Sequence, residues 1–91
     1  MQQKSKVRSR AIRSNKDKFT CSNALSVHFT NTGDNPVKIF GESSSQLIEL
    51  ATNETFEVKG HPLAPLNQLF TFDFGATQSI ISIIETYIIQ D

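Results

Sequence analysis

Several short segments alternate apolar and polar residues, and this period of two is the strongest constraint on the fold. It is clearest in FTFDF (70–74), where every second residue is phenylalanine, and in ALSVHFT (24–30). Because successive side chains of a β-strand point to opposite faces, such alternation is typical of half-buried strands. The residues expected to face the core are Leu25, Val27, Phe29, Val37, Ile39, Phe56, Val58, Phe70, Phe72 and Phe74.

Clusters of turn-forming residues separate these segments. They are NTGDNP (31–36), GESSSQ (41–46), ATNE (51–54) and GHPLAP (60–65), and the two prolines of the last cluster exclude a central strand there. About six or seven short strands, with a turn roughly every ten residues, are typical of a sandwich or a small barrel. The sequence therefore predicts an all-β fold, namely a small antiparallel β-sandwich of the jelly-roll or immunoglobulin-like type.

The last segment, SIISIIETYIIQD (79–91), fits either a helix or a strand by its apolar spacing. Its isoleucine, threonine and tyrosine residues favour a strand, because β-branched side chains lose rotamer freedom in a helix. A strand that is apolar on both faces needs cover on both, and so small a domain supplies only one. We therefore expect a neighbouring chain to cover Ile80, Ile84 and Ile88, together with Phe40, which breaks the alternation of its own segment.

The small size of the chain also predicts association. A domain of this size buries only ~60% of its unfolded surface and is marginally stable by itself. Its single cysteine, Cys21, excludes an internal disulfide, and His28 and His61 have no ligand spacing relative to it. We therefore expect no metal and no cofactor, and we expect support from other copies or other proteins. No apolar run approaches the ~20 residues of a membrane-spanning helix.

Positive charge is concentrated at the start of the chain. Seven of its nine lysines and arginines lie in residues 1–18 with one acidic residue, whereas residues 19–91 hold two cations and eight anions. The sequence therefore predicts a basic N-terminal arm (1–18) that is separate from a β-sandwich domain (19–91). The residues expected to bind nucleic-acid phosphates or a neighbouring subunit are Lys4, Lys6, Arg8, Arg10, Arg13, Lys16 and Lys18.

Enzymatic chemistry has little support in the sequence. No residue marks Cys21 as an activated thiol, the carboxylates are scattered along outward strand faces, and no glycine-rich phosphate loop is present. We therefore expect no catalytic residues. The phenylalanines at 70, 72 and 74 could stack on the bases of a single strand, but the acidic outward faces nearby favour packing in the core.

The stretch LSVHFTNTGDNPVKIFG (25–41), followed by IELATNETFEV (48–58), resembles a pattern of small bacteriophage virion proteins. In that pattern a first strand precedes an Asn-x-Gly turn, a second strand with V-x-I, and a short turn before an aromatic strand. The resemblance covers about a third of the chain, and Thr52-Asn53 stands where such proteins often have Pro-Gly. It implies a β-sandwich that builds or decorates a capsid or a head–tail joint, with a basic arm that reaches the packaged genome.

The sequence thus predicts a non-enzymatic structural subunit of a virion, which is a homo-oligomer or binds other virion proteins. The alternative is a small β protein that binds single-stranded nucleic acid. The arm would contact packaged nucleic acid or a neighbouring subunit in the first case, and exposed aromatic residues of the sandwich would read single strands in the second.

Overall fold

The structure, a computed structural model, describes residues 4–14, 17–42, 45–75 and 78–89. In these residues every regular element is a strand, so the all-β prediction is confirmed. The strands are β1 (Lys4–Ile12), β2 (Lys18–Asn31), β3 (Val37–Phe40), β4 (Gln46–Leu50), β5 (Thr55–Lys59), β6 (Leu66–Asp73) and β7 (Ile81–Ile89). The C-terminal segment is therefore a strand, as its β-branched residues predict. The described residues include no helix of the length and apolarity that crossing a membrane would require.

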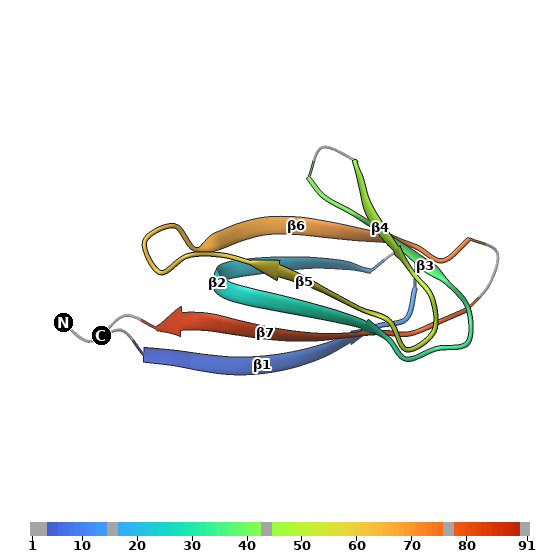
Figure 1. Cartoon of the computed structure of the whole chain (residues 1–91), viewed down its shortest axis with the longest axis horizontal. Helices are drawn as coiled ribbons and strands as arrows, with labels where there is room; N and C mark the ends of the chain where they lie inside the picture. Colours follow the sequence, from blue (N-terminus) through green and yellow to red (C-terminus); the bar gives the residue numbers. More distant parts are fainter. Residues whose placement is uncertain (1–3, 15–16, 43–44, 76–77, 90–91) are drawn as a thin grey trace.

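All pairs of neighbouring strands are antiparallel. The strand order is β1-β7-β2-β6-β3-β4, and β5 pairs with β2 off this path. β1 and β4 therefore lie at the two ends of the sheet, and Figure 1 shows β1 along one side of the molecule and the β3–β4 hairpin projecting from the other.

β2 reverses direction within its own length. Its first half pairs with β6, and its second half pairs with β7 on one side and β5 on the other. A straight strand would separate Phe19 from Phe29 by about 33 Å, yet their ring centroids are 6.2 Å apart. The reversal occurs near Asn23, whose φ of 53° is a left-handed conformation that asparagine tolerates. The sheet consequently folds back on itself, as Figure 1 shows.

Phenylalanines fill the space between the two halves of the folded sheet. Phe29 is fully buried, and its ring lies 4.9 Å from Phe70, 6.1 Å from Phe72 and 6.3 Å from Phe56. The alternation thus predicts the core correctly for the buried residues Val27, Phe29, Val37, Ile39, Phe70, Phe72 and Phe74. The half-buried Phe56 and Val58 pack against this core.

Leu25 departs from the predicted core. The register of β2 shifts between Ala24 and Ser26, so an extra residue interrupts the alternation at that point. Ala24 is fully buried as a result, and Leu25 is only half-buried. A one-residue irregularity moves side chains between faces, and a strict period of two cannot anticipate it.

A buried asparagine joins three connections at one end of the sheet. Asn31 is fully buried, and its Nδ2 donates to the backbone oxygens of Asn35 and Leu50 at 2.8 and 2.9 Å. Its Oδ1 accepts from the backbone N–H of Gly33 at 2.9 Å and from Ser79 Oγ at 3.0 Å. The side chain therefore ties the β2–β3 connection to β4 and to the segment that leads into β7.

We expect Asn31→Ala to lower the free energy of unfolding by about 2–3 kcal/mol, because it leaves buried donors and acceptors without partners. Urea denaturation followed by circular dichroism measures this loss. Asn35→Ala is the matched control, since the Asn35 side chain makes an exposed hydrogen bond to the Gln78 oxygen. Equal losses for the two variants would show that the four bonds of Asn31 have no special weight.

Residues 4–12 do not form an arm separate from the sheet. Lys4–Ile12 is β1, which pairs with β7 at all nine positions, from Lys4↔Ile89 to Ile12↔Ile81. Ile12 is fully buried in the core, and Lys18 begins β2. The boundary predicted between residues 18 and 19 therefore falls inside β2. Cations are compatible with this position because the side chains of an edge strand can keep their charged ends in water.

Candidate functional site

The candidate site is the basic edge strand β1 with the cleft beside it. Lys6, Arg8 and Arg10 lie opposite Tyr87, Glu85 and Ile83 in the register of β1 and β7. Partners in an antiparallel pair share a face, so these cations lie on the face that carries the buried Ile83 and Glu85. The other face of β1 carries Ser5, Val7, Ser9 and Ala11, which are all exposed.

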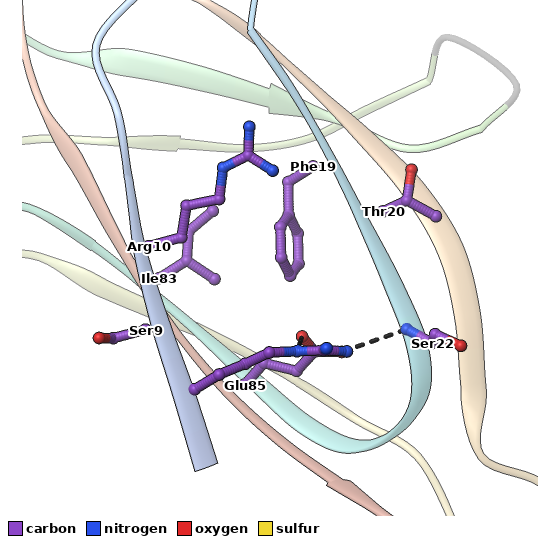
Figure 2. Close-up of a pocket in the computed structure, with 8 residues that line it drawn as sticks. Ser9, Arg10, Phe19, Thr20, Ser22, Ile83 and Glu85 are labelled. Atoms are coloured by element: carbon purple, nitrogen blue, oxygen red, sulfur yellow. Dashed lines mark hydrogen bonds and ion pairs between the residues drawn. The ribbon is translucent and has the colours of Figure 1, made fainter.

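Glu85 is a buried acid at the centre of this site. Only 1% of its side chain is exposed. Its Oε1 accepts from Arg8 Nε at 2.6 Å, and its Oε2 accepts from the backbone N–H of Ser22 at 3.1 Å. The carboxylate thereby joins β7 to β1 and to the reversing part of β2, and Figure 2 shows the bond as a dashed line that ends at the backbone nitrogen of Ser22.

Arg8 serves mainly to stabilise this buried acid. Its guanidinium also lies over the Tyr87 ring, 4.1 Å from the centroid, in a cation–π contact. The hydrogen bond to Glu85 raises the pKa of Arg8, so the guanidinium remains charged. Half of the Arg8 side chain is exposed, but its Nε donor is already engaged by Glu85.

A cleft of about 390 Å³ lies next to this pair. β1 contributes Arg8 and Arg10, β2 contributes Phe19 and Ser22, and β7 contributes Ile83 and Glu85. In Figure 2, Arg10 and Phe19 extend into the cleft from opposite walls. Arg10 is exposed and makes no ion pair within the described residues, so the cleft offers one available cation beside an apolar wall.

The remaining cations predicted to make contacts are dispersed. Lys6 and Lys18 are exposed, and Lys4 begins β1. The backbone N–H of Arg13 lies 3.5 Å from an Asp17 carboxylate oxygen, and its side chain lines a different cleft with Asp34 and Ser79. Lys16 lies outside the described residues. Of the predicted cations whose side chains the structure describes, Lys6, Arg8 and Arg10 lie together on one face.

The predicted subunit-contact residues do not form a uniform exposed stripe. Ile84 is 48% exposed on the face of β7 opposite the core. Phe40 and Ile80 are half-buried, and Ile88 is only 7% exposed. Ile88 is therefore covered within the chain itself and is not available to a neighbour, in contrast to the prediction.

The groups considered for thiol catalysis are not assembled. Cys21 is buried, and burial raises the pKa of its thiol, which favours the neutral and unreactive form. His28 Nε2 lies 3.0 Å from a Glu57 carboxylate oxygen, and His61 Nδ1 accepts from the backbone N–H of Leu63. Within the described part of the chain, no group of three or more histidine, cysteine or acidic residues could hold a metal ion.

Sequence reasoning overlooked Glu85, although a signal for it exists. Residues 81, 83 and 85 share one face of the strand, and the first two are isoleucines. An acid that continues a buried apolar alternation needs a cationic partner, since an unpaired buried charge is strongly unfavourable. The partner, Arg8, lies 77 residues away in sequence, and only the pairing of β1 with β7 brings the two together.

We expect Arg8→Ala to lower the free energy of unfolding by about 2–3 kcal/mol, because it leaves the Glu85 carboxylate buried without its cation. This expected loss is smaller than the loss for breaking a fully buried ion pair, because Arg8 is half exposed. Arg10→Ala is the matched control on the same face of the same strand, and its effect should stay within about 0.5 kcal/mol. Chemical denaturation of both variants tests the difference, and equal effects would contradict a structural role for Arg8.

The chain was compared with known proteins. No protein-family model, no curated protein and no solved structure matches it.

Proposed function

We propose that this chain is a non-enzymatic structural subunit of a virion that assembles with neighbouring subunits through its sheet. The observation that supports assembly most directly is β1, a nine-residue strand that pairs with β7 alone among the described residues. Its other edge carries backbone donors and acceptors that a further strand can pair with. The virion as the setting of this assembly rests on the resemblance to small bacteriophage virion proteins.

The distribution of charge favours contact between subunits. β1 contains three lysines or arginines besides Arg8 and no acidic residue, whereas residues 19–91 hold eight anions and two cations. The acidic remainder of one copy therefore attracts β1 of another and repels a phosphate backbone. This supports a neighbouring subunit over packaged nucleic acid as the principal partner of β1.

The alternative function is the binding of single-stranded nucleic acid, and it requires aromatic rings that the bases can reach. Phe70, Phe72 and Phe74 are each less than 5% exposed. The large hydrophobic residues that are well exposed in the described part of the chain are Val7, Leu47, Leu63 and Ile84, and none is aromatic. Base stacking needs an accessible ring face, so the support for the alternative function comes from the cations of β1.

We further propose that the folded-back sheet is a β-sandwich. One layer would hold β1, β7, the second half of β2, and β5, and the other would hold the first half of β2 with β6, β3 and β4. The contact between the rings of Phe19 and Phe29 supports this arrangement, because these residues belong to opposite halves of β2.

Sedimentation of the purified chain across a salt series, with and without single-stranded DNA, tests the proposed function. We expect concentration-dependent assembly without nucleic acid that weakens as salt rises, because exposed charge pairs are screened beyond ~8 Å at physiological ionic strength. A chain that stays monomeric at low salt but binds the DNA would favour the alternative. In that case the logarithm of affinity should fall with the logarithm of salt, with a slope of about −0.7 per phosphate contacted.

A further inference from the structure

The two ends of the sheet carry opposite charge. β1 at one end contains Lys4, Lys6, Arg8 and Arg10 without an acid, and β4 at the other end contains Glu49 without a cation. Within the described residues β1 pairs with β7 alone in the sheet, and β4 with β3 alone. Each therefore presents an unpaired edge, and the two edges belong to opposite ends of the strand order.

We propose that the free edge of β1 pairs with the free edge of β4 in a second copy of this chain, so that the sheet continues from one copy to the next. This inference rests on the proposed function, because it names the surface through which the subunits assemble. The two surfaces are different parts of the molecule, so the contact is heterologous and its repetition gives a ring or a filament.

Charge excludes the simplest competing contact, the pairing of β1 with β1 of another copy. That contact would place Lys6, Arg8 and Arg10 of one strand beside the same cations of the other, and like charges on neighbouring strands are destabilising. Cations on an edge strand commonly prevent such pairing. The same cations attract an edge that carries an acidic residue. They therefore favour pairing with β4 and disfavour pairing with a second β1.

β5 also has a free edge within the described residues, and it is a poorer partner than β4. Its acid, Glu57, already contacts His28 Nε2 at 3.0 Å and Lys59 Nζ at 3.9 Å. Glu49, by contrast, is exposed and makes no ion pair within the described residues. Lys38 lies opposite Glu49 in β4 and opposite Asp73 in β6, so one cation faces two anions and this end of the sheet remains acidic.

The lengths of the two edges limit the strength of the contact. β4 has five residues, whereas β1 has nine, so pairing covers about half of β1. β4 also presents Leu47, which is 41% exposed, to the new neighbour. A short strand addition reinforced by exposed ion pairs should be weak for one pair of copies and should strengthen when many copies repeat it. Arg10 is exposed and makes no ion pair within the described residues, so it is available for this role, whereas Arg8 is engaged by Glu85.

A charge exchange tests the pairing. Arg10→Glu alone, or Glu49→Lys alone, should raise the dissociation constant for self-association about tenfold, because each places like charges on the two edges. The double variant should recover most of the lost affinity, since it restores opposite charges with their positions exchanged. Lys59→Glu and Asp34→Lys are the matched controls, because they make the same charge changes away from both edges and should leave association unchanged.

Hydrogen–deuterium exchange adds a second readout. Amides of β1 and β4 should become protected on assembly, and those of β5 should not. The β1–β4 contact would be overturned if the chain self-associates but the charge changes at Arg10 and Glu49 leave the dissociation constant unchanged. Protection of other strands on assembly would also overturn it. Either result would leave the proposed assembly intact. A chain that stays monomeric at all concentrations and low salt would overturn both. Self-association that requires added nucleic acid would also overturn the contact, and would assign the cations of β1 to phosphates.

Discussion

A chain that lacks residues 1–13 should lose its cooperative thermal unfolding transition. The deletion removes β1 and, with it, the fully buried Ile12 and the cation that pairs with the buried Glu85. It also exposes one edge of β7 along nine residues, five of them isoleucines. A small domain has only ~5 kcal/mol of stability to lose, and a long apolar edge of this kind promotes aggregation.

Circular dichroism during heating, together with light scattering, measures this outcome. The matched control is the full-length chain with Lys6→Thr and Arg10→Thr, which removes charge but keeps the strand. Because both side chains are exposed, each substitution should change the free energy of unfolding by no more than about 0.5 kcal/mol. A truncated chain that kept the melting transition of the intact one would restore the view of these residues as a dispensable arm.

The second large effect is expected at Phe29. Phe29→Ala should lower the free energy of unfolding by about 3–5 kcal/mol, as large-to-small changes in a packed core do. Phe29 is fully buried and contacts the rings of Phe19, Phe56, Phe70 and Phe72. The alanine variant would leave a cavity between the two halves of the folded sheet and would remove several aromatic contacts at once.

This loss is close to the whole stability of a small domain, so the alanine variant is expected to be largely unfolded at 25 °C. Phe29→Leu keeps most of the buried volume and should remain folded with a smaller loss, which urea denaturation quantifies. Phe56→Ala provides the comparison outside the centre of the core, since Phe56 is half-buried and should cost less. A loss at Phe56 as large as that at Phe29 would contradict the central place of Phe29.

The single cysteine, Cys21, is buried, and each of the two histidines makes its own contact. His28 lies beside a Glu57 carboxylate oxygen, and His61 accepts a hydrogen bond from the backbone N–H of Leu63. The cleft beside β1 is lined by a buried acid, one available arginine and an apolar wall.

The features that could be predicted from the sequence are local ones. The alternation in residues 70–74 and 37–40 identified strands and their inward faces, because the side-chain period of a strand is a property of a few consecutive residues. The same reasoning chose a strand for the C-terminal segment, and its isoleucines at 81 and 83 are buried in β7. The acidic residues near Phe70, Phe72 and Phe74 favour a place in the core over base stacking, and all three side chains are buried.

Other features of the fold depend on partners that are distant in sequence. β1 is a strand because β7 supplies its hydrogen bonds, and its composition, rich in cations and serine, resembles that of a solvated tail. The reversal of β2 at Asn23 and the displacement of Leu25 arise from an irregularity that interrupts the period of two. The ion pair of Arg8 with Glu85 joins residues 77 positions apart. Local patterns cannot specify such contacts, because pairing and burial are properties of the folded sheet and not of any one segment.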